Sequence, residues 1–132
     1  LDLGCGTGLL SIAAVRLGGS SVMAVDHNSL ACAVAQQNGA YNNAVDNIHV
    51  KCMDIRQELP ATGVDVIMAN LHHELLAELF REPAFWQAGL YIISGFMPGG
   101  EEQLLASLPA VPPPFLDRRR LDKWCVWVLG HV

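Results

Sequence analysis

The sequence has few charged residues and no long apolar run. Charged residues make up 16% of the 132 positions and hydrophobic residues 52%, which excludes a disordered chain and favours one globular domain with a substantial core. No apolar stretch approaches the ~18–20 residues that cross a bilayer, and no signal-peptide pattern opens the chain. We therefore expect a cytoplasmic protein without a membrane partner.

Metal-ligand patterns are missing as well. The four cysteines, Cys5, Cys32, Cys52 and Cys125, form no C-x-x-C pair and no Cys/His set with zinc spacing. The segment His72-His73-Glu74 is a poor chelator, because neighbouring residues of a helix point about 100° apart. The sequence predicts reduced, buried thiols and no bound metal.

Positive charge is scarce. The formal net charge is −5, and Arg118-Arg119-Arg120 is the one dense basic cluster in the sequence. A run of this kind is more typical of a solvated strand edge than of a phosphate-binding patch. The charge balance therefore argues against nucleic acid as a partner.

Strand-like and helix-like segments alternate along the chain. The patterns predict strands at 1–3, 21–26, 47–53, 64–69 and 90–96, helices at 8–17, 28–38, 72–80 and 101–108, turns at 60–63 and 98–100, and a terminal hairpin of strands 115–121 and 124–129. Such alternation predicts an α/β fold, a Rossmann-like three-layer sandwich with a mainly parallel sheet and helices on both faces. The hairpin adds an antiparallel edge strand.

The chain opens in what reads as the end of a strand, Leu1-Asp2-Leu3, and has no initiator Met. We expect residues 1–132 to be one domain of a longer protein, truncated at its N-terminus. We then expect a partly open site, an exposed apolar patch, or coverage by a neighbouring chain, as in a homo-oligomer.

Four features follow successive predicted strands. They are the loop Gly4-Cys5-Gly6-Thr7-Gly8, then Asp26, Asp54 and Asn70. Ligands of open parallel sheets bind beyond the carboxyl ends of the strands, and glycines there let the backbone approach a ligand closely. Taken singly, each feature also fits an ordinary turn, helix cap or strand end. The prediction of a ligand site rests on their order.

The loop spacing distinguishes between cofactors. A dinucleotide-binding loop reads G-x-G-x-x-G, whereas here Leu9 stands at the third glycine position and the loop reads G-x-G-x-G. Asp2 lies two residues before the first glycine, where a carboxylate suits an ammonium or sulfonium better than a pyrophosphate. Asp26 suits a ribose and Asp54 an adenine, so the sequence predicts S-adenosylmethionine.

The segment LDLGCGTG resembles motif I of the class I S-adenosylmethionine-dependent methyltransferases. A closer resemblance covers nearly the whole chain. The stretches LDLGCGTGLLSIAAVRLG, AVDHNSLACAVAQQN, VDVIMANL, YIISGF with EEQLL, and KWCVWVLG resemble the catalytic domain of the ribosomal protein L11 methyltransferases. This resemblance implies a seven-stranded sheet whose last strand is antiparallel, and methylation of amino groups of a ribosomal protein.

The resemblance also implies a set of site residues. Gly4, Asp26 and Asn70 match the family's cofactor contacts, and other positions match wider class I contacts. With their neighbours, the predicted cofactor-binding residues are Asp2, Gly4, Cys5, Gly6, Gly8, Asp26, His27, Asp54, Ile55 and Asn70. The chain departs from the family in two respects. Nothing in it corresponds to the upstream domain that docks the ribosomal protein, or to the threonine-bearing segment just before motif I. In addition, His72-His73 stands where small or apolar residues are expected.

We expect a protein N-methyltransferase whose acceptor is ribosomal protein L11 or a similar protein. The acceptor amine must arrive neutral, and Asn70 is the predicted catalytic residue because its side-chain carbonyl can accept a hydrogen bond from that amine. His72 is an alternative base, or a solvated helix residue. A small-molecule or RNA methyltransferase, and a non-catalytic S-adenosylmethionine-binding module, are the competing hypotheses.

Overall fold

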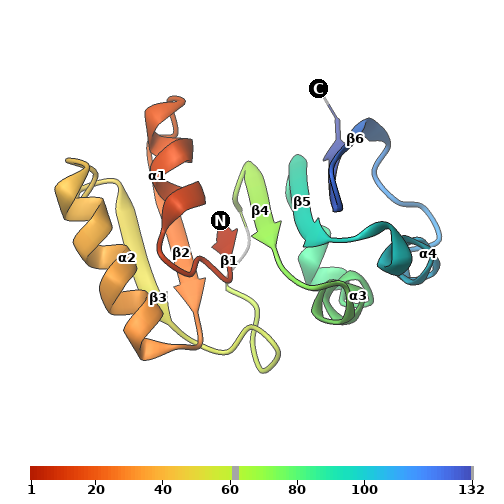
Figure 1. Cartoon of the computed structure of the whole chain (residues 1–132), viewed down its shortest axis with the longest axis horizontal. Helices are drawn as coiled ribbons and strands as arrows, with labels where there is room; N and C mark the ends of the chain where they lie inside the picture. The colour runs from red at the N-terminus through yellow and green to blue at the C-terminus, as the bar shows by residue number, and fades with distance from the viewer. Residues whose placement is uncertain (61–62, 132) are drawn as a thin grey trace. The chain divides into compact units, whose positions relative to one another are not determined.

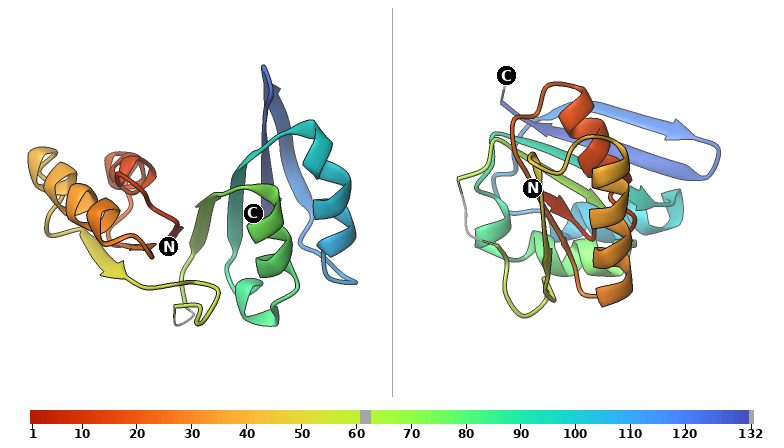
Figure 2. Two further views of the ribbon diagram at one scale, coloured as in Figure 1. Left: turned by 60° about the horizontal axis from the view of Figure 1, so that its bottom comes forward. Right: turned by 90° about the vertical axis from the view of Figure 1, so that its left-hand side faces the viewer.

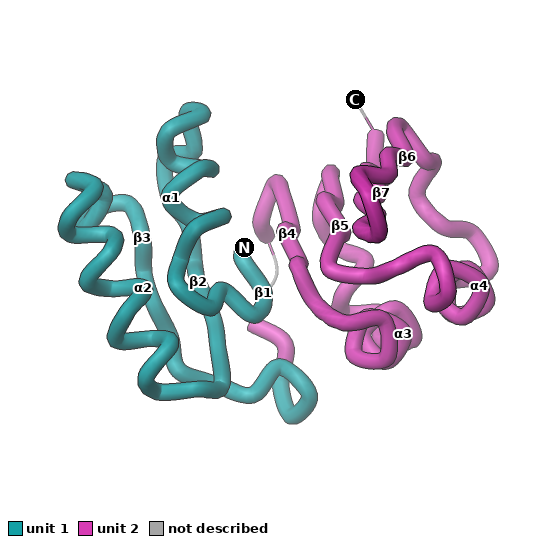
Figure 3. Tube along the Cα trace, viewed as in Figure 1, with its two compact units in different colours: residues 1–58 teal, residues 59–132 magenta. Residues whose placement is uncertain are grey.

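The computed structural model describes residues 1–60 and 63–131. The chain divides into two units, Leu1–Glu58 and Leu59–Val132 (Figure 3). Each unit has its own strands, helices and buried core. The expected turn at 60–63 lies partly outside the described residues, at positions 61 and 62.

The first unit is a run of parallel strands joined by helices (Figure 1). Its strands have the order β3-β2-β1, with Asp2 opposite Ala24 and Asp26 opposite Cys52. The elements are β1 Asp2–Leu3, α1 Leu9–Arg16, β2 Val22–Asp26, α2 Ser29–Tyr41 and β3 Ile48–Cys52. Both crossovers step the same way along the sheet, so the right-handed rule places α1 and α2 on one face.

Helix α2 begins with a side-chain cap and runs longer than predicted. The Asn28 side-chain oxygen accepts hydrogen bonds from the N–H groups of Leu30 (2.9 Å) and Ala31 (3.3 Å). The prediction that the helix ends near residue 38 is wrong, because the buried Gly39 lies inside the helix. A Cβ at Gly39 would lie 3.9 Å from Ile48 Cδ1, so this position faces β3 closely. Packing against the strand outweighs the ~1 kcal/mol helix cost of glycine.

The second unit has four strands in the order β4-β5-β7-β6. Strands β4 and β5 are parallel, and β7 is antiparallel to both β5 and β6. The elements are β4 Val66–Asn70, α3 His73–Phe80, the short 3-10 helix η1 Pro83–Phe85, β5 Leu90–Phe96, α4 Pro98–Ser107, β6 Phe115–Leu121 and β7 Trp124–Gly130. Figures 1 and 2 both show α3 and α4 side by side.

Aromatic side chains form much of the core of the second unit. Ring centroids of Phe80, Phe85, Trp86 and Tyr91 lie 4.9–5.6 Å apart in five contacts. Trp127 of β7 makes edge contacts with two further rings and donates from its indole N–H to Glu101 of α4 (3.0 Å). Buried aromatic pairs of this geometry add to the stability that their buried area provides.

The fold class expected from the sequence is confirmed. The seven strands form an α/β architecture that is mainly parallel, and its C-terminal strand β7 is antiparallel. A second expectation about the elements is wrong: residues 98–100 are the first turn of α4 rather than a free turn. Pro98 stands at the first helical position, where a missing N–H costs nothing and the fixed φ suits a helix. No helix in the described part of the chain has the length and apolarity to cross a membrane.

Candidate functional site

The glycine-rich loop is held in a conformation that favours glycine. Gly4, Gly6 and Gly8 have φ angles of +70°, +52° and +81°. A Cβ at Gly8 would lie 3.2 Å from the Cβ of Ala35 in α2, whereas a Cβ at Gly6 would project into open space. Gly8 therefore serves packing between loop and helix, and Gly6 leaves room beside the backbone for a ligand.

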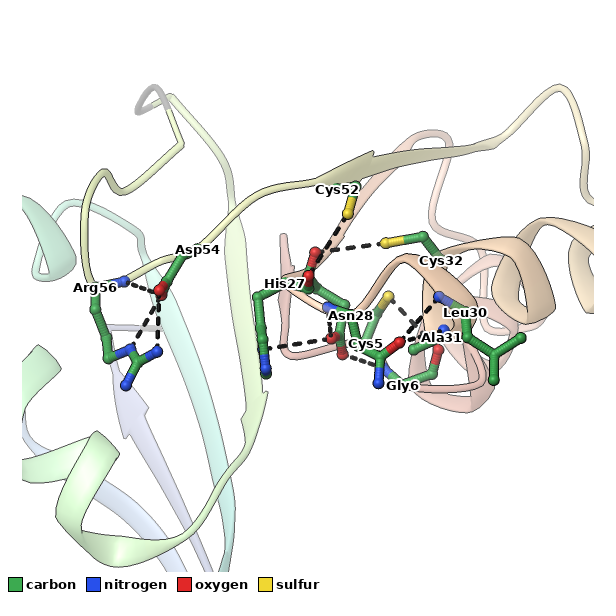
Figure 4. Close-up of polar contacts among 11 residues, drawn as sticks. Cys5, Gly6, His27, Asn28, Leu30, Ala31, Cys32, Cys52, Asp54 and Arg56 are labelled. Carbon is green, nitrogen blue, oxygen red and sulfur yellow. Dashed lines mark hydrogen bonds and ion pairs between the residues drawn. The ribbon is translucent and has the colours of Figure 1, made fainter.

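Asp26 ends β2 and is bound directly to this loop. Its Oδ2 accepts a hydrogen bond from the Gly6 N–H (2.9 Å), and its Oδ1 accepts one from the Asn28 N–H (2.9 Å) (Figure 4). The side chain is 12% exposed. Each carboxylate oxygen can accept a second hydrogen bond, so the group can bind two adjacent hydroxyls while staying fixed.

His27 is brought next to the same carboxylate. Its Nδ1 lies 3.7 Å from Asp26 Oδ1, and its side chain is largely exposed. The ring therefore stands at the solvent side of the predicted ribose site, and its own contacts do not fix it strongly.

Asp2 is placed differently from the other predicted ligand groups. Its side chain is buried, and its Oδ2 accepts a hydrogen bond from the Ser11 hydroxyl at 2.6 Å. Burial raises the pKa of the Asp2 carboxyl above its ordinary value, and the hydrogen bonds with Ser11 oppose that shift. The Ser11 contact had no signal in the sequence, because a serine in a helix gives no hint of its partner.

Asp54 follows β3 and forms a compact turn with Arg56. The Asp54 carboxylate accepts hydrogen bonds from the Arg56 main-chain N–H (3.0 Å) and from Nε (3.1 Å) and Nη2 (3.0 Å) of its guanidinium. These bonds lower the pKa of Asp54, so the group is ionised at neutral pH. Ile55 between them is buried. Arg56 was not among the predicted site residues.

Cys5 contributes backbone rather than a reactive thiol. Its N–H donates to the Val25 carbonyl at 2.9 Å, which ties the loop to β2. Burial, with the nearby Asp2 and Asp26 carboxylates, raises the pKa of the Cys5 thiol to about 12. The thiol therefore stays protonated and inert at neutral pH.

Asn70 is the last residue of β4 and belongs to the second unit. Its Cα pairs with Ser94, Ser94 pairs with Val126, and Val126 pairs with Arg119. Residues directly opposite one another share a face of the sheet. Gly95 accommodates the Asn70 side chain: its φ is +88°, and a Cβ there would lie 2.6 Å from Asn70 Oδ1.

A cavity of about 680 Å³ lies over this row of residues. Its lining includes Asn70, Ser94, Gly95, Arg119, Arg120 and Trp124. The sequence predicts Asn70 as a site residue, but it predicts the arginines as part of a solvated strand edge. Strand register brings these residues together, and no local sequence pattern indicates it.

His72 has a structural role at the start of α3. It is the N-cap of this helix, where its Nδ1 lies 3.4 Å from the Leu75 N–H and 3.0 Å from Glu74 Oε2. The glutamate lies in the first turn of α3, where a negative charge is favourable. Among the described residues, no three His, Cys, Asp or Glu side chains gather in a way that could hold a metal ion.

The arrangement in the first unit suits a nucleoside with two adjacent hydroxyls. A fixed carboxylate stands beside a glycine loop with open space, and a second ionised carboxylate follows the next strand. Asn38 Nδ2 also donates to the Thr7 carbonyl at 2.9 Å, which holds the loop against α2. These bonds fix the loop and the Asp26 carboxylate relative to each other.

Comparison with known proteins identifies relatives over nearly the whole chain. The family model described as ribosomal protein L11 methyltransferase (PrmA) matches residues 1–128. A ribosomal protein L11 methyltransferase of Pelobacter propionicus is 35% identical over 97% of this chain and 41% of its own length. One of Thermotoga petrophila is 33% identical over 98% of this chain and 48% of its own length. The chain thus spans less than half of these relatives.

Solved structures agree with this result. The ribosomal protein L11 methylase of Lactobacillus delbrueckii subsp. bulgaricus superposes with a TM-score of 0.81 at 25% identity, covering 98% of this chain and 69% of that one. An RNA methyltransferase of Salinibacter ruber, solved with S-adenosyl-L-homocysteine, superposes with a TM-score of 0.72 at 20% identity. The match covers 97% of this chain and 76% of that one, and it supports the fold alone. The chain belongs to the ribosomal protein L11 methyltransferase (PrmA) family.

Proposed function

We propose that this chain carries the S-adenosylmethionine-binding and methyl-transfer part of a protein N-methyltransferase that acts on ribosomal protein L11 or a similar protein. The observation that carries the proposal is the Asp26 carboxylate, fixed to the Gly6 N–H of a glycine loop in a chain of this family. The reduced state of the four cysteines is consistent with a cytoplasmic location.

The cofactor would be held mainly by the first unit. Asp26 would accept the ribose hydroxyls, Asp54 would face the adenine, and Gly4 and Gly6 would bring backbone close to the amino-acid part. Asp2 would balance the ammonium or sulfonium charge through the loop. S-adenosylmethionine supplies an electrophilic methyl group on a sulfonium, so no metal or covalent enzyme group is needed.

The task of the protein is then alignment and exclusion of water. The acceptor nitrogen forms its bond to the methyl carbon as the carbon–sulfur bond breaks, and it must enter without its extra proton. We assign Asn70 to the acceptor: its side-chain oxygen, over Gly95, would accept a hydrogen bond from the amine and orient its lone pair. The cavity beside Asn70 would admit the acceptor side chain.

The first test is calorimetric titration of this chain with S-adenosylmethionine, with NADH as the comparison ligand. Micromolar affinity for S-adenosylmethionine is expected. Asp26→Ala is expected to lower it by about tenfold to a hundredfold, because hydrogen bonds to a charged group are lost. The exposed Asp46→Asn serves as the matched control. Equal binding of NADH, or unchanged affinity in Asp26→Ala, would refute the cofactor assignment.

The acceptor class requires a separate assay. Transfer of a labelled methyl group is measured with ribosomal protein L11, with RNA and with small amines as acceptors. Two arginines line the cavity beside Asn70, and this observation makes RNA the second candidate. Labelling of RNA alone would replace the protein acceptor. Cofactor binding without labelling of any acceptor would favour a non-catalytic module.

A further inference from the structure

Two cysteines meet at the turn that carries the Asp26 carboxylate. Cys32 lies in the first turns of α2, and Cys52 is the last residue of β3, opposite Asp26 in the sheet register. The Cys32 thiol lies 3.4 Å from the main-chain oxygen of Asp26, and the Cys52 thiol lies 3.7 Å from that of His27. Figure 4 shows both sulfurs reaching toward this same turn.

The two thiols approach the main-chain oxygens of two consecutive residues, Asp26 and His27. Burial, followed by the neighbouring Cys52 thiol, raises the pKa of the Cys32 thiol to about 11. Cys32 is buried, whereas Cys52 is exposed, so the prediction of buried thiols is wrong for Cys52. The pair therefore combines one thiol that a soluble oxidant can reach with one protected thiol at the same turn. This combination is typical of a redox-active pair with a reacting and a resolving cysteine.

We propose that Cys32 and Cys52 form a reversible disulfide, and that this bond makes the Asp26 site sensitive to peroxide. The function proposed above makes no use of either sulfur. The other two cysteines lack this arrangement: Cys5 is buried in the glycine loop and Cys125 in β7 of the other unit.

The chemistry balances with hydrogen peroxide as the oxidant. The exposed Cys52 thiolate attacks one peroxide oxygen, which breaks the O–O bond, leaves a sulfenic acid on Cys52 and releases hydroxide. The Cys32 sulfur then attacks the Cys52 sulfur. The S–S bond forms as the S–O bond of the sulfenic acid breaks. The departing hydroxyl group takes the Cys32 proton, the hydroxide from the first step takes the proton lost by Cys52, and two water molecules result. Two electrons pass from the two sulfurs to the peroxide. A dithiol reductant reverses the reaction by thiol exchange.

The bond would act on the neighbouring carboxylate. A disulfide holds its sulfurs at about 2.05 Å, which is closer than two thiols in contact. Closing that gap must pull the start of α2 toward the end of β3. Asn28, the N-cap of α2, would move with this helix start, and its N–H binds Asp26 Oδ1. The bonds from both thiols to the main-chain oxygens would be lost. This effect on ligand binding rests on the proposed function, whereas the disulfide itself does not.

The test treats this chain with hydrogen peroxide, blocks the remaining thiols and digests it with trypsin. Cleavage after Lys51 separates the two cysteines, so a disulfide links peptide 17–51 to peptide 52–56. The expected result is this linked pair, its loss on reduction, and an intact mass lower by two hydrogen atoms. Cys52→Ser, at an exposed position, should abolish the link, and Cys125→Ser should leave it unchanged.

A second measurement follows the Asp26 site. Oxidised chain is expected to bind S-adenosylhomocysteine about tenfold more weakly than reduced chain, the effect of disturbing one hydrogen bond to a charged group. Reduction should restore the affinity, and oxidised Cys52→Ser should bind like the reduced chain. Oxygen addition at Cys52 without a linked peptide would overturn the proposed disulfide. A linked peptide with unchanged affinity would overturn its coupling to the Asp26 site. Failure of the reduced chain to bind would count against the proposed function and leave the peptide result standing.

Discussion

At the residue scale, Gly6 and Gly8 of the glycine-rich loop have different roles. Gly6 and Gly8 both have positive φ, which costs a residue with a side chain about 1–2 kcal/mol. Gly8→Ala must also fit a methyl 3.2 Å from Ala35, whereas the methyl of Gly6→Ala meets open space. We expect Gly8→Ala to lower the free energy of unfolding more. Gly6→Ala should instead weaken S-adenosylmethionine binding by about tenfold or more. Urea unfolding and calorimetry of both variants check this, and the reverse ranking would contradict it.

Asp2 is expected to favour binding at the expense of stability. Burial raises its pKa above the ordinary 3.8, so its ionisation at higher pH opposes folding. The protonated form of Asp2 therefore stabilises the folded state. This contribution is fully present below about pH 3.8 and is lost as pH rises through the raised folded-state pKa. Asp2→Asn should therefore gain stability relative to the original chain as pH rises above 4. It should also bind S-adenosylmethionine about tenfold more weakly. A stability difference that does not change between pH 3 and pH 7 would contradict this prediction.

At the element scale, the irregularity in β5 positions Asn70. The pairing of β5 with β7 shifts register between Ser94 and Phe96, and Gly95 between them has φ +88°. Gly95→Ala would place a methyl 2.6 Å from both Asn70 Oδ1 and the Leu71 main-chain nitrogen, and should displace Asn70 together with the end of β4. We expect at least a tenfold fall in methyl-transfer turnover with nearly unchanged cofactor affinity. Gly89→Ala, where the methyl makes an ordinary 3.5 Å contact, is the control. A parallel loss of cofactor affinity would instead indicate a general disruption of the sheet.

Helix α4 is joined to the terminal hairpin through Glu101. This carboxylate pairs with Arg118 of β6 and accepts a hydrogen bond from Trp127 of β7, and the Arg118 contact is the main cause of its lowered pKa. A lowered folded-state pKa stabilises the fold above the ordinary value of 4.5, and this contribution is lost as pH falls through the lowered value. Glu101→Gln should cost ~0.5–1 kcal/mol at pH 7, since the pair is partly exposed. The difference should shrink at pH 3 in urea unfolding. The exposed Glu102→Gln should show neither effect.

At the scale of the whole molecule, a ligand that binds the folded state stabilises it. S-adenosylhomocysteine at a hundred times its Kd should add about 2.7 kcal/mol to the free energy of unfolding. Hydrogen exchange is expected to slow first at residues 4–8 and 26–28, where the loop and Asp26 would contact the ligand. Protection at residues 69–71 as well would assign Asn70 to the cofactor, whereas its absence would leave Asn70 to the acceptor. A ligand effect confined to the second unit would contradict the proposed site.

Much of the fold could be predicted because it depends on local patterns. The strand over 90–96 and the hairpin strands were predicted almost to the residue, since the apolar run of the first and the Asp122-Lys123 turn between the other two specify them locally. The errors occur where a residue with a poor local propensity is supported by its neighbours. Gly39 stays in α2 because it is packed against Ile48, and Pro98 starts α4 because the first helical position needs no N–H donor.

The sequence by itself determined the fold class, the glycine loop, the acid after β2 and the family, because each depends on residue type and spacing along the chain. Only the tertiary structure decided which side chains meet. It placed Asp2 on Ser11, aligned Asn70 with Arg119 across the sheet and brought the thiols of Cys32 and Cys52 to the same turn. Strand register and helix packing set these contacts. Both depend on partners distant in the sequence, so local patterns carry no signal for them.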